Sequence, residues 1–340
     1  MPIKLNAILF KNGQFQDPKL NNIKIKSVIN KINQRLNVII HKNTTKTELA
    51  KYLHACCFSP PKSTFIRAIK NGNFISWPGL TESLIEKMPP SPNTAYGHLK
   101  QEKSNLQSTK VKTTVNDDNF PASDIPNTIT NTFCASIEKF AFTDKAYTDL
   151  TGRFPTQSSR GNNYVYVCYS HDGNAILAEP LKNRSAAEIV RAWTAVNNKL
   201  ALAGIQPSIY ILDNEISNEF KTALHKIDIK FQLVPPHIHR RNAAERAIQS
   251  FKNHFLAGLA SCNDKFPLRE WDRLIPQAQI TLNLLRNARA NPKLSAYAYV
   301  FGNYDFNKCP LAPPGTHVVV HSKPNNRATW GFHGKQGWTI

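Results

Sequence analysis

Strands are predicted in the second half of the chain, where apolar and polar residues alternate in short runs or apolar residues dominate. The runs fall at 145–150, 163–169, 175–180, 208–213 and 229–234. Asp172-Gly173 separates the second run from the third and predicts a tight hairpin turn. The run 208–213 is almost wholly apolar, which is typical of a strand buried inside a sheet.

Helices are predicted between and after these strands. Ser185 and Glu188 have the spacing of a capping box and open a helix that Gly204 ends. Four residues share its apolar face: Ile189, Trp193, Val196 and Leu200. A short helix is expected at about 220–224, and longer ones at about 242–260 and 267–288.

The predicted helix at 242–260 has two distinct sides. Its apolar positions recur at helical spacing and are Ala244, Ile248, Phe251 and Phe255. A polar stripe beside them contains Arg241, Glu245, Gln249 and Lys252. The whole order of elements is strand, hairpin, strand, helix, strand, helix, strand and long helices, which predicts an α/β fold built on a mixed sheet.

Composition divides the chain into four regions. Residues 1–103 form a mainly helical N-terminal region, and residues 104–130 form a flexible linker rich in Ser, Thr, Asn, Asp, Lys and Pro. Residues 131–300 hold the predicted α/β core. Residues 301–340 begin a C-terminal β module that stops after one or two strands, which suggests a truncated reading frame because an unfinished sheet exposes an open edge.

The N-terminal region contains a cluster of possible zinc ligands, His54, Cys56 and Cys57. No Cys-x-x-Cys or His-x₃₋₅-His pair accompanies them, and they fall in a helix that a capping box at Thr45 and Glu48 is expected to open. We therefore interpret both cysteines as core residues. The six cysteines of the chain show no regular framework and suit a reducing compartment.

The chain is strongly basic. Lys and Arg number 43 against 23 Asp and Glu, which gives a net charge of +20. This excess favours a polyanionic partner, most simply nucleic acid, because each neutralised phosphate releases counterions. No apolar stretch reaches the ~20 residues of a spanning helix, so a membrane is not expected as a partner. Without a signal peptide either, the expected location is the nucleus or the cytoplasm.

Three acids stand where predicted elements begin or end. Asp149 lies in the first strand, Asp213 closes the run 208–213, and Glu245 lies at the start of the long helix. A carboxylate that ends an apolar strand is costly unless it has a partner. Hard oxygen ligands of this kind suit Mg²⁺ or Mn²⁺, so the three acids predict a site for divalent metal.

Other residues near these positions are weaker candidates. Glu215 follows Asp213 by two positions but has no further acid at a supporting spacing, and Asp144 precedes its strand. His237, His239 and His254 have no paired geometry and are interpreted as phosphate-proximal or simply exposed. Four cations are candidates for contacts to a DNA backbone: Arg240, Arg241, Arg246 and Lys252.

The segments around the three acids resemble motifs of retroelement integrases, and most closely the integrase of copia-type LTR retrotransposons. Thr148-Asp149-Leu-Thr-Gly-Arg-Phe-Pro resembles the first motif, Ile211-Leu-Asp213-Asn-Glu the second, and Asn242-Ala-Ala-Glu245-Arg-Ala-Ile the third. The second and third acids are slightly closer together than is usual in that family. Upstream, the segment 54–80 resembles the region that precedes the core in such polyproteins.

The resemblance implies a ribonuclease H-like catalytic core, with Asp149, Asp213 and Glu245 as catalytic residues that bind two Mg²⁺ or Mn²⁺ ions. It also implies a homo-oligomer that acts on double-stranded DNA, trims 3′ ends and joins them to target DNA. The sequence departs from the family in lacking a His-His-Cys-Cys zinc module, and it has no protease or polymerase motif. DNA-end binding and multimer assembly by the N-terminal region are therefore in question.

Two other functions remain open from the sequence. The chain could be an inactive retroelement remnant that only binds nucleic acid, which the missing zinc module and the abrupt end favour and the intact acids disfavour. It could also be a ribonuclease H-like nuclease that cuts DNA and never joins it.

Overall fold

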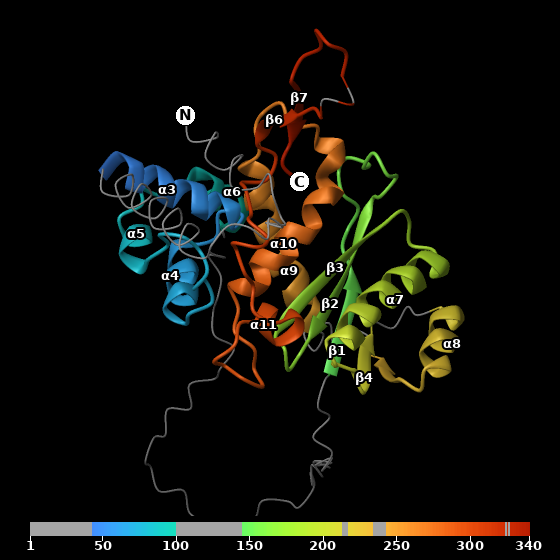
Figure 1. Cartoon of the computed structure of the whole chain (residues 1–340). Helices are drawn as coiled ribbons and strands as arrows, with labels where there is room; N and C mark the ends of the chain where they lie inside the picture. The colour runs from blue at the N-terminus through green and yellow to red at the C-terminus, as the bar shows by residue number, and fades with distance from the viewer. Residues whose placement is uncertain (1–42, 100–144, 213–216, 234–242, 324, 326) are drawn as a thin grey trace, which may run out of the picture.

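The computed structural model describes residues 43–99, 145–212, 217–233, 243–323, 325 and 327–340 (Figure 1). A five-stranded mixed sheet lies at the centre of the larger body. Its strands are β1 (Lys145–Leu150), β2 (Tyr164–Ser170), β3 (Ala175–Leu181), β4 (Ile209–Leu212) and β5 (Lys230–Leu233). None of the described helices is long and apolar enough to span a membrane.

The strand order is β3-β2-β1-β4-β5. The first three strands pair antiparallel, whereas β4 runs parallel to β1, and β5 runs parallel to β4. The Asp172-Gly173 turn joins β2 to β3 as predicted, with Asn174 in the left-handed region at φ 49°. This topology confirms the predicted ribonuclease H-like mixed sheet.

Helices cover both faces of the sheet. One face packs on α7 (Ala186–Leu202), α8 (Asn218–Lys226) and α11 (Ala296–Phe301). The other face packs on α9 (Ala243–Ala260) and α10 (Ile275–Leu284), with the 3₁₀ helix η2 (Leu268–Leu274) between them in sequence. Each face thus has its own apolar core.

The predicted boundary signals are partly confirmed. Ser185 caps α7 by accepting a hydrogen bond from the backbone N–H of Glu188 (3.4 Å), and Gly204 follows the helix at φ +73°. The return bond of a capping box is absent here, because the Glu188 carboxylate accepts from the backbone N–H of Lys182 (3.3 Å) instead. The predicted apolar face of α7 is confirmed. Trp193, Val196 and Leu200 are buried, and Ile189 is half-buried against the same core.

Two boundary predictions are wrong. The expected helix at 267–288 is divided into η2 and α10, with Pro276 in the first turn of α10. Proline has no N–H to donate, so it fits the start of a helix better than its interior. In the N-terminal region, α3 begins at Asn43, so Thr45 is inside the helix and cannot cap it.

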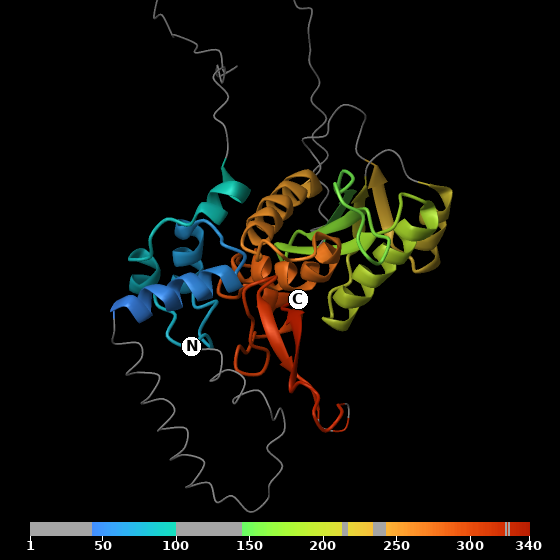
Figure 2. The same ribbon diagram turned by 90° about the horizontal axis from the view of Figure 1, so that it is seen from above.

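Four helices make up the described N-terminal region: α3 (Asn43–Cys56), α4 (Lys62–Lys70), α5 (Glu82–Glu86) and α6 (Pro92–His98). Cys56 and Cys57 are fully buried in the core of these helices and are free thiols, as predicted. Figure 2 shows the four helices on the side of α9 and α10 that faces away from the sheet. The same core contains Leu284 and Leu285, so it joins this region to α10.

Two glycines let the N-terminal region approach α9 closely. Phe58, at φ 62°, stacks on His254 with ring centroids 5.3 Å apart and lies over Gly258. A Cβ on Gly258 would fall 1.8 Å from the Phe58 ring, and a Cβ on Gly97 would fall 2.4 Å from the carbonyl oxygen of Asn253. Only glycine fits at these two contacts without a shift of the chain.

The free edge of β3 is covered by polar side chains of α10. Asn283 accepts from the backbone N–H of Ile176 and donates to its carbonyl oxygen, both at 2.8 Å. Gln279 accepts from the backbone N–H of Ala178 at 3.0 Å. These bonds satisfy backbone groups that an edge strand would otherwise leave open.

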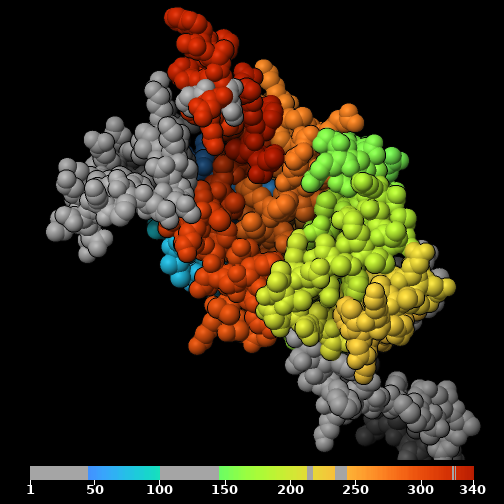
Figure 3. All heavy atoms as spheres, turned by 45° about the vertical axis from the view of Figure 1, so that its right-hand side comes forward, coloured from blue at the N-terminus to red at the C-terminus, as the bar shows by residue number. Residues whose placement is uncertain are grey.

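The C-terminal part forms an antiparallel pair of strands, β6 (His317–His321) and β7 (Gly334–Trp338). Trp338 packs edge-on against Phe266, which attaches the pair to the core. The loop between the strands stands out from the body (Figure 3) and carries Trp330, which is 98% exposed. The expected small β module is therefore present as two strands.

Candidate active site

Asp149 lies near the end of β1 on the face of the sheet that packs against α9. Successive side chains of a strand point to opposite faces. Ala146 and Leu150 belong to the α7 core, whereas Tyr147 packs against the α9 core, so Asp149 shares the face of Tyr147. Its side chain is half-buried, and its Oδ1 accepts a hydrogen bond from the backbone N–H of Leu150 (2.6 Å).

Asp213 lies outside the described residues, but the strand that leads to it is described. β4 ends at Leu212, beside β1 in a parallel pair with Tyr147 opposite Ile211. Tyr210 and Leu212 belong to the α7 core, so Ile211 shares the face of Asp149. Asp144 and Glu215, the two weaker acidic candidates, also lie outside the described residues.

Glu245 lies in the first turn of α9 and is exposed. An acid is favourable at this end of a helix because the unsatisfied N–H groups carry partial positive charge. In the described residues its carboxylate has no ion pair or hydrogen bond. α9 packs against β1 and β2, so Glu245 and Asp149 belong to the same side of the sheet.

These two acids suit a metal site by their chemistry, since carboxylate oxygens are the ligands that Mg²⁺ and Mn²⁺ prefer. Within the described residues no group of three or more His, Cys, Asp or Glu could hold a metal ion. Because the second acid of the predicted set lies outside those residues, the assignment of the three acids stays a prediction.

The faces of α9 are as predicted. Ala244, Ile248, Phe251 and Phe255 are buried in the core, and Glu245, Gln249 and Lys252 are exposed. Arg246 is also exposed, so two of the four candidate DNA contacts are open to solvent on this helix. Arg240 and Arg241 lie outside the described residues, as do His237 and His239.

The expectation that His254 is exposed is wrong. His254 is buried at 1% exposure, stacks on Phe58, and its Nε2 is hydrogen-bonded to the Thr281 hydroxyl (2.9 Å). Burial is the main reason that its pKa falls from 6.5 to about 3, with a smaller contribution from His98. It is therefore a neutral core residue.

Comparison with solved structures finds retroviral integrases. The catalytic core domain of BIV integrase matches with a TM-score of 0.36 and 13% identity, over 46% of this chain and 93% of that chain. The HTLV-2 integrase catalytic core domain in complex with magnesium, in its trimeric form, matches with a TM-score of 0.36 and 19% identity, over 46% and 96%.

A third match is the simian T-cell lymphotropic virus intasome in complex with PP2A regulatory subunit B56 gamma, with a TM-score of 0.38 and 16% identity, over 57% of this chain and 68% of that chain. The likeness concerns the fold and assigns no role to any residue. No protein-family model matches the sequence, and no curated protein matches it.

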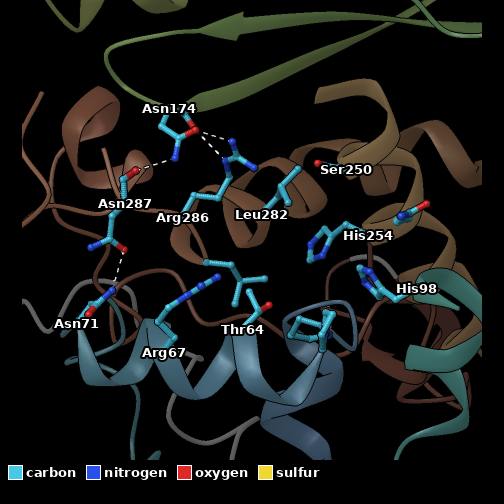
Figure 4. Close-up of a pocket in the computed structure, with 14 residues that line it drawn as sticks. Thr64, Arg67, Asn71, His98, Asn174, Ser250, His254, Leu282, Arg286 and Asn287 are labelled. Atoms are coloured by element: carbon cyan, nitrogen blue, oxygen red, sulfur yellow. Dashed lines mark hydrogen bonds between the residues drawn. The ribbon is translucent and has the colours of Figure 1, made fainter. Parts of the chain in front are cut away.

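A second polar site, which no sequence pattern predicts, is a cleft of about 670 Å³ between α4 and the helices α9 and α10. Figure 4 shows Arg67 and Arg286 on opposite sides of it. These two residues come from segments more than 200 positions apart, and the sequence pattern assigns no role to either. Only the packing of the N-terminal helices on the core brings them to one cavity.

Proposed function

We propose that the chain is a metal-dependent polynucleotidyl transferase of the retroelement integrase type, from a copia-type LTR retrotransposon, with Asp149, Asp213 and Glu245 as its catalytic acids. The activity would trim 3′ ends of double-stranded DNA and join them to target DNA. One observation carries the proposal, the register of the parallel pair of β1 and β4.

In that pair Tyr147 is opposite Ile211, and Ala146 is opposite Tyr210. If the pairing continued by two residues, position 213 would stand directly beside Asp149. Side-chain alternation from Ile211 would also turn it to the same face as Asp149. With this register the two motif acids would be neighbours, a relation that an accidental pair of surface acids has no reason to show.

The third acid comes from the helix that covers this face. Glu245 is in the first turn of α9, exposed and without an ion pair in the described part of the chain, so its carboxylate is available to a ligand. The three acids would hold two Mg²⁺ or Mn²⁺ ions. Such ions, when bound, activate a water or 3′-OH nucleophile and stabilise the leaving oxygen of a phosphodiester.

The basic residues of α9 would position the DNA. Arg246 and Lys252 are exposed on the helix that carries Glu245, and Arg240 and Arg241 precede it in the sequence. Contacts of this kind fix the backbone and carry little sequence choice. We expect a homo-oligomer, with the 3′-OH attacking target DNA directly and no covalent protein intermediate.

The decisive experiment is a strand-transfer assay with labelled duplex ends and Mg²⁺. Asp149→Asn, Asp213→Asn and Glu245→Gln keep side-chain size and remove the charge that holds metal. Each should lower activity by at least about 100-fold, the upper end of what loss of supporting residues around a metal site costs.

Asp264→Asn is the matched control, because Asp264 is exposed and is not a candidate ligand. Joining by the wild type and by Asp264→Asn, with loss in the other three variants, would support the proposal. Cutting without joining would identify a nuclease instead. DNA binding without either reaction would identify an inactive nucleic-acid-binding protein.

A further inference from the structure

The cleft between the N-terminal helices and the core carries two arginines and, among the residues that the structure describes, no acid in its wall. Its 14 lining residues include Arg67 from α4, Arg286 after α10, and the histidines His98 and His254. No Asp or Glu is among them. A volume of about 670 Å³ is in the range of cavities that bind small molecules and exceeds what one phosphate group needs.

Arg286 is the first cation of this cleft, and its partners are neutral. Its Nε donates to the carbonyl oxygen of Asn174 (2.9 Å), and one terminal nitrogen donates to the Asn174 side chain. The guanidinium also lies over the ring of Tyr169, 5.8 Å from its centroid. In the described residues no carboxylate forms an ion pair with it.

Arg286 is half-buried, and its charge is not neutralised by any carboxylate of the described residues. Burial lowers the pKa of its guanidinium, Tyr169 acts in the opposite direction, and Arg289 nearby lowers the pKa further. A cation removed from water is costly unless an opposite charge accompanies it. An anion in the cleft would supply that charge.

Arg67 is the second cation, and it faces the cavity from the opposite wall. Figure 4 shows its side chain extending from α4 into the cleft, one turn beyond Thr64. Within the described part of the chain, Arg67 makes no side-chain hydrogen bond and no ion pair. Its five N–H donors are thus open, in the planar arrangement that suits the oxygens of a phosphate.

The wall is held in place by a hydrogen-bond network that joins the N-terminal region to the core. Asn287 accepts from the side-chain amides of Asn71 (3.2 Å) and Asn73 (3.1 Å), and its backbone carbonyl accepts from Asn174 (2.8 Å). The same Asn174 holds Arg286. The two guanidinium groups are therefore carried by parts of the chain that are fixed relative to each other, which favours binding without large rearrangement.

We propose that this cleft binds a phosphate-class anion between Arg67 and Arg286, with the Thr64 hydroxyl as a further donor. The anion could be a free phosphate or a phosphate of a polynucleotide. Arg246, Ser250 and Asn253 form one stripe of α9 that leads from the turn of Glu245 to the cleft wall, so a polynucleotide held at the proposed active site could reach it. Only this second source rests on the proposed function.

The test compares Arg67→Gln with Arg269→Gln, which removes the same charge from an exposed arginine outside the cleft. Calorimetry would measure binding of inorganic phosphate and of a short oligonucleotide to the whole chain. Arg67→Gln should weaken phosphate binding about tenfold or more, the effect of losing a charge-assisted contact, and Arg269→Gln should not. Arg67 is exposed, so its variant should unfold at the wild-type temperature.

A second readout locates the anion. Phosphate should slow the modification of Arg67 by phenylglyoxal, mapped by peptide mass spectrometry, and leave Arg269 unprotected. If the Arg67 variant loses phosphate and oligonucleotide binding together, the source is a polynucleotide, and if it loses phosphate alone, the source is a free anion. Equal behaviour of the two variants, or no protection of Arg67, would overturn the proposal.

The two proposals fail separately. Glu245→Gln should keep full phosphate protection of Arg67, because Glu245 is not part of the cleft wall. Loss of strand transfer in that variant with intact anion binding would support both proposals. Absence of strand transfer in the wild type would end the transferase proposal and leave the anion site standing.

Discussion

His254 is a buried titratable side chain at the contact between the N-terminal region and the core. It stacks on Phe58 of the N-terminal region and is hydrogen-bonded to Thr281 of α10. Its pKa of about 3 means that the ring stays neutral in the folded protein at any ordinary pH. His54, buried in the neighbouring core, also has a lowered pKa, mainly because of burial.

Acid should therefore destabilise the fold through this residue. In the unfolded chain a histidine binds its proton near pH 6.5, whereas His254 resists protonation down to about pH 3. Between these pH values the unfolded state binds more protons than the folded state. The stability that neutral His254 contributes is therefore fully present above pH 6.5 and is lost as the pH falls toward 3. The free energy of unfolding should fall by up to about 1.4 kcal/mol per pH unit from this group.

Urea unfolding at pH 7, 6 and 5 measures this slope. His254→Gln keeps a hydrogen-bonding group and cannot take up the proton, so its slope should be shallower than that of the wild type. His333→Asn, at an exposed position, is the control and should keep the wild-type slope. An unchanged slope in His254→Gln would show that acid acts elsewhere.

At the scale of single elements, the edge strand β3 depends on α10 for part of its hydrogen bonding. Asn283→Ala would leave the buried N–H and C=O of Ile176 without their partner. Each unsatisfied buried group costs about 1–3 kcal/mol, so we expect a loss of about 2–4 kcal/mol in the free energy of unfolding. Chemical denaturation with an intrinsic fluorescence signal would measure it.

Asn198→Ala on the exposed side of α7 is the matched control and should change stability by less than about 0.5 kcal/mol. Equal stability of the two variants would mean that water replaces the Asn283 side chain at the strand edge.

The strands and α7 could be predicted because local signals determine them. Period-two alternation, the Asp172-Gly173 turn and the Ser185 cap all act within a few residues, and the structure confirms each of these elements. The mixed sheet followed from their order. The division at Pro276 was missed because a helical apolar pattern continues across it.

Features that depend on contacts between distant segments could not be predicted. Burial of His254 requires Phe58, and the edge of β3 is covered by Asn283, over a hundred residues away. Asp149 and Glu245 could be proposed from the contexts of strand and helix, and the structure adds that both belong to the α9 side of the sheet. The cleft of Arg67 and Arg286 left no local trace in the sequence.

For the whole molecule, the net charge of +20 predicts that binding to nucleic acid depends on salt concentration. If the four candidate cations contact phosphates, the logarithm of the duplex-DNA affinity should fall against the logarithm of salt concentration with a slope of about −3 to −4. Arg246→Gln should reduce the magnitude of that slope by about 1, and Arg269→Gln should not. Fluorescence anisotropy between ~50 and ~200 mM salt would measure both.

A salt-independent affinity would contradict phosphate binding altogether. An equal change of the salt slope in Arg246→Gln and Arg269→Gln would mean that DNA binds the basic surface without a preferred site.

The packing of Phe58 against Gly258 limits how the protein can be shortened. A core expressed from Lys145 onward would lack that ring, and the hollow beside His254 and Phe255 would open to water. Exposed apolar hollows promote association between molecules. The N-terminal region therefore covers an apolar surface of α9, and a protein shortened to the core should self-associate more than the full chain.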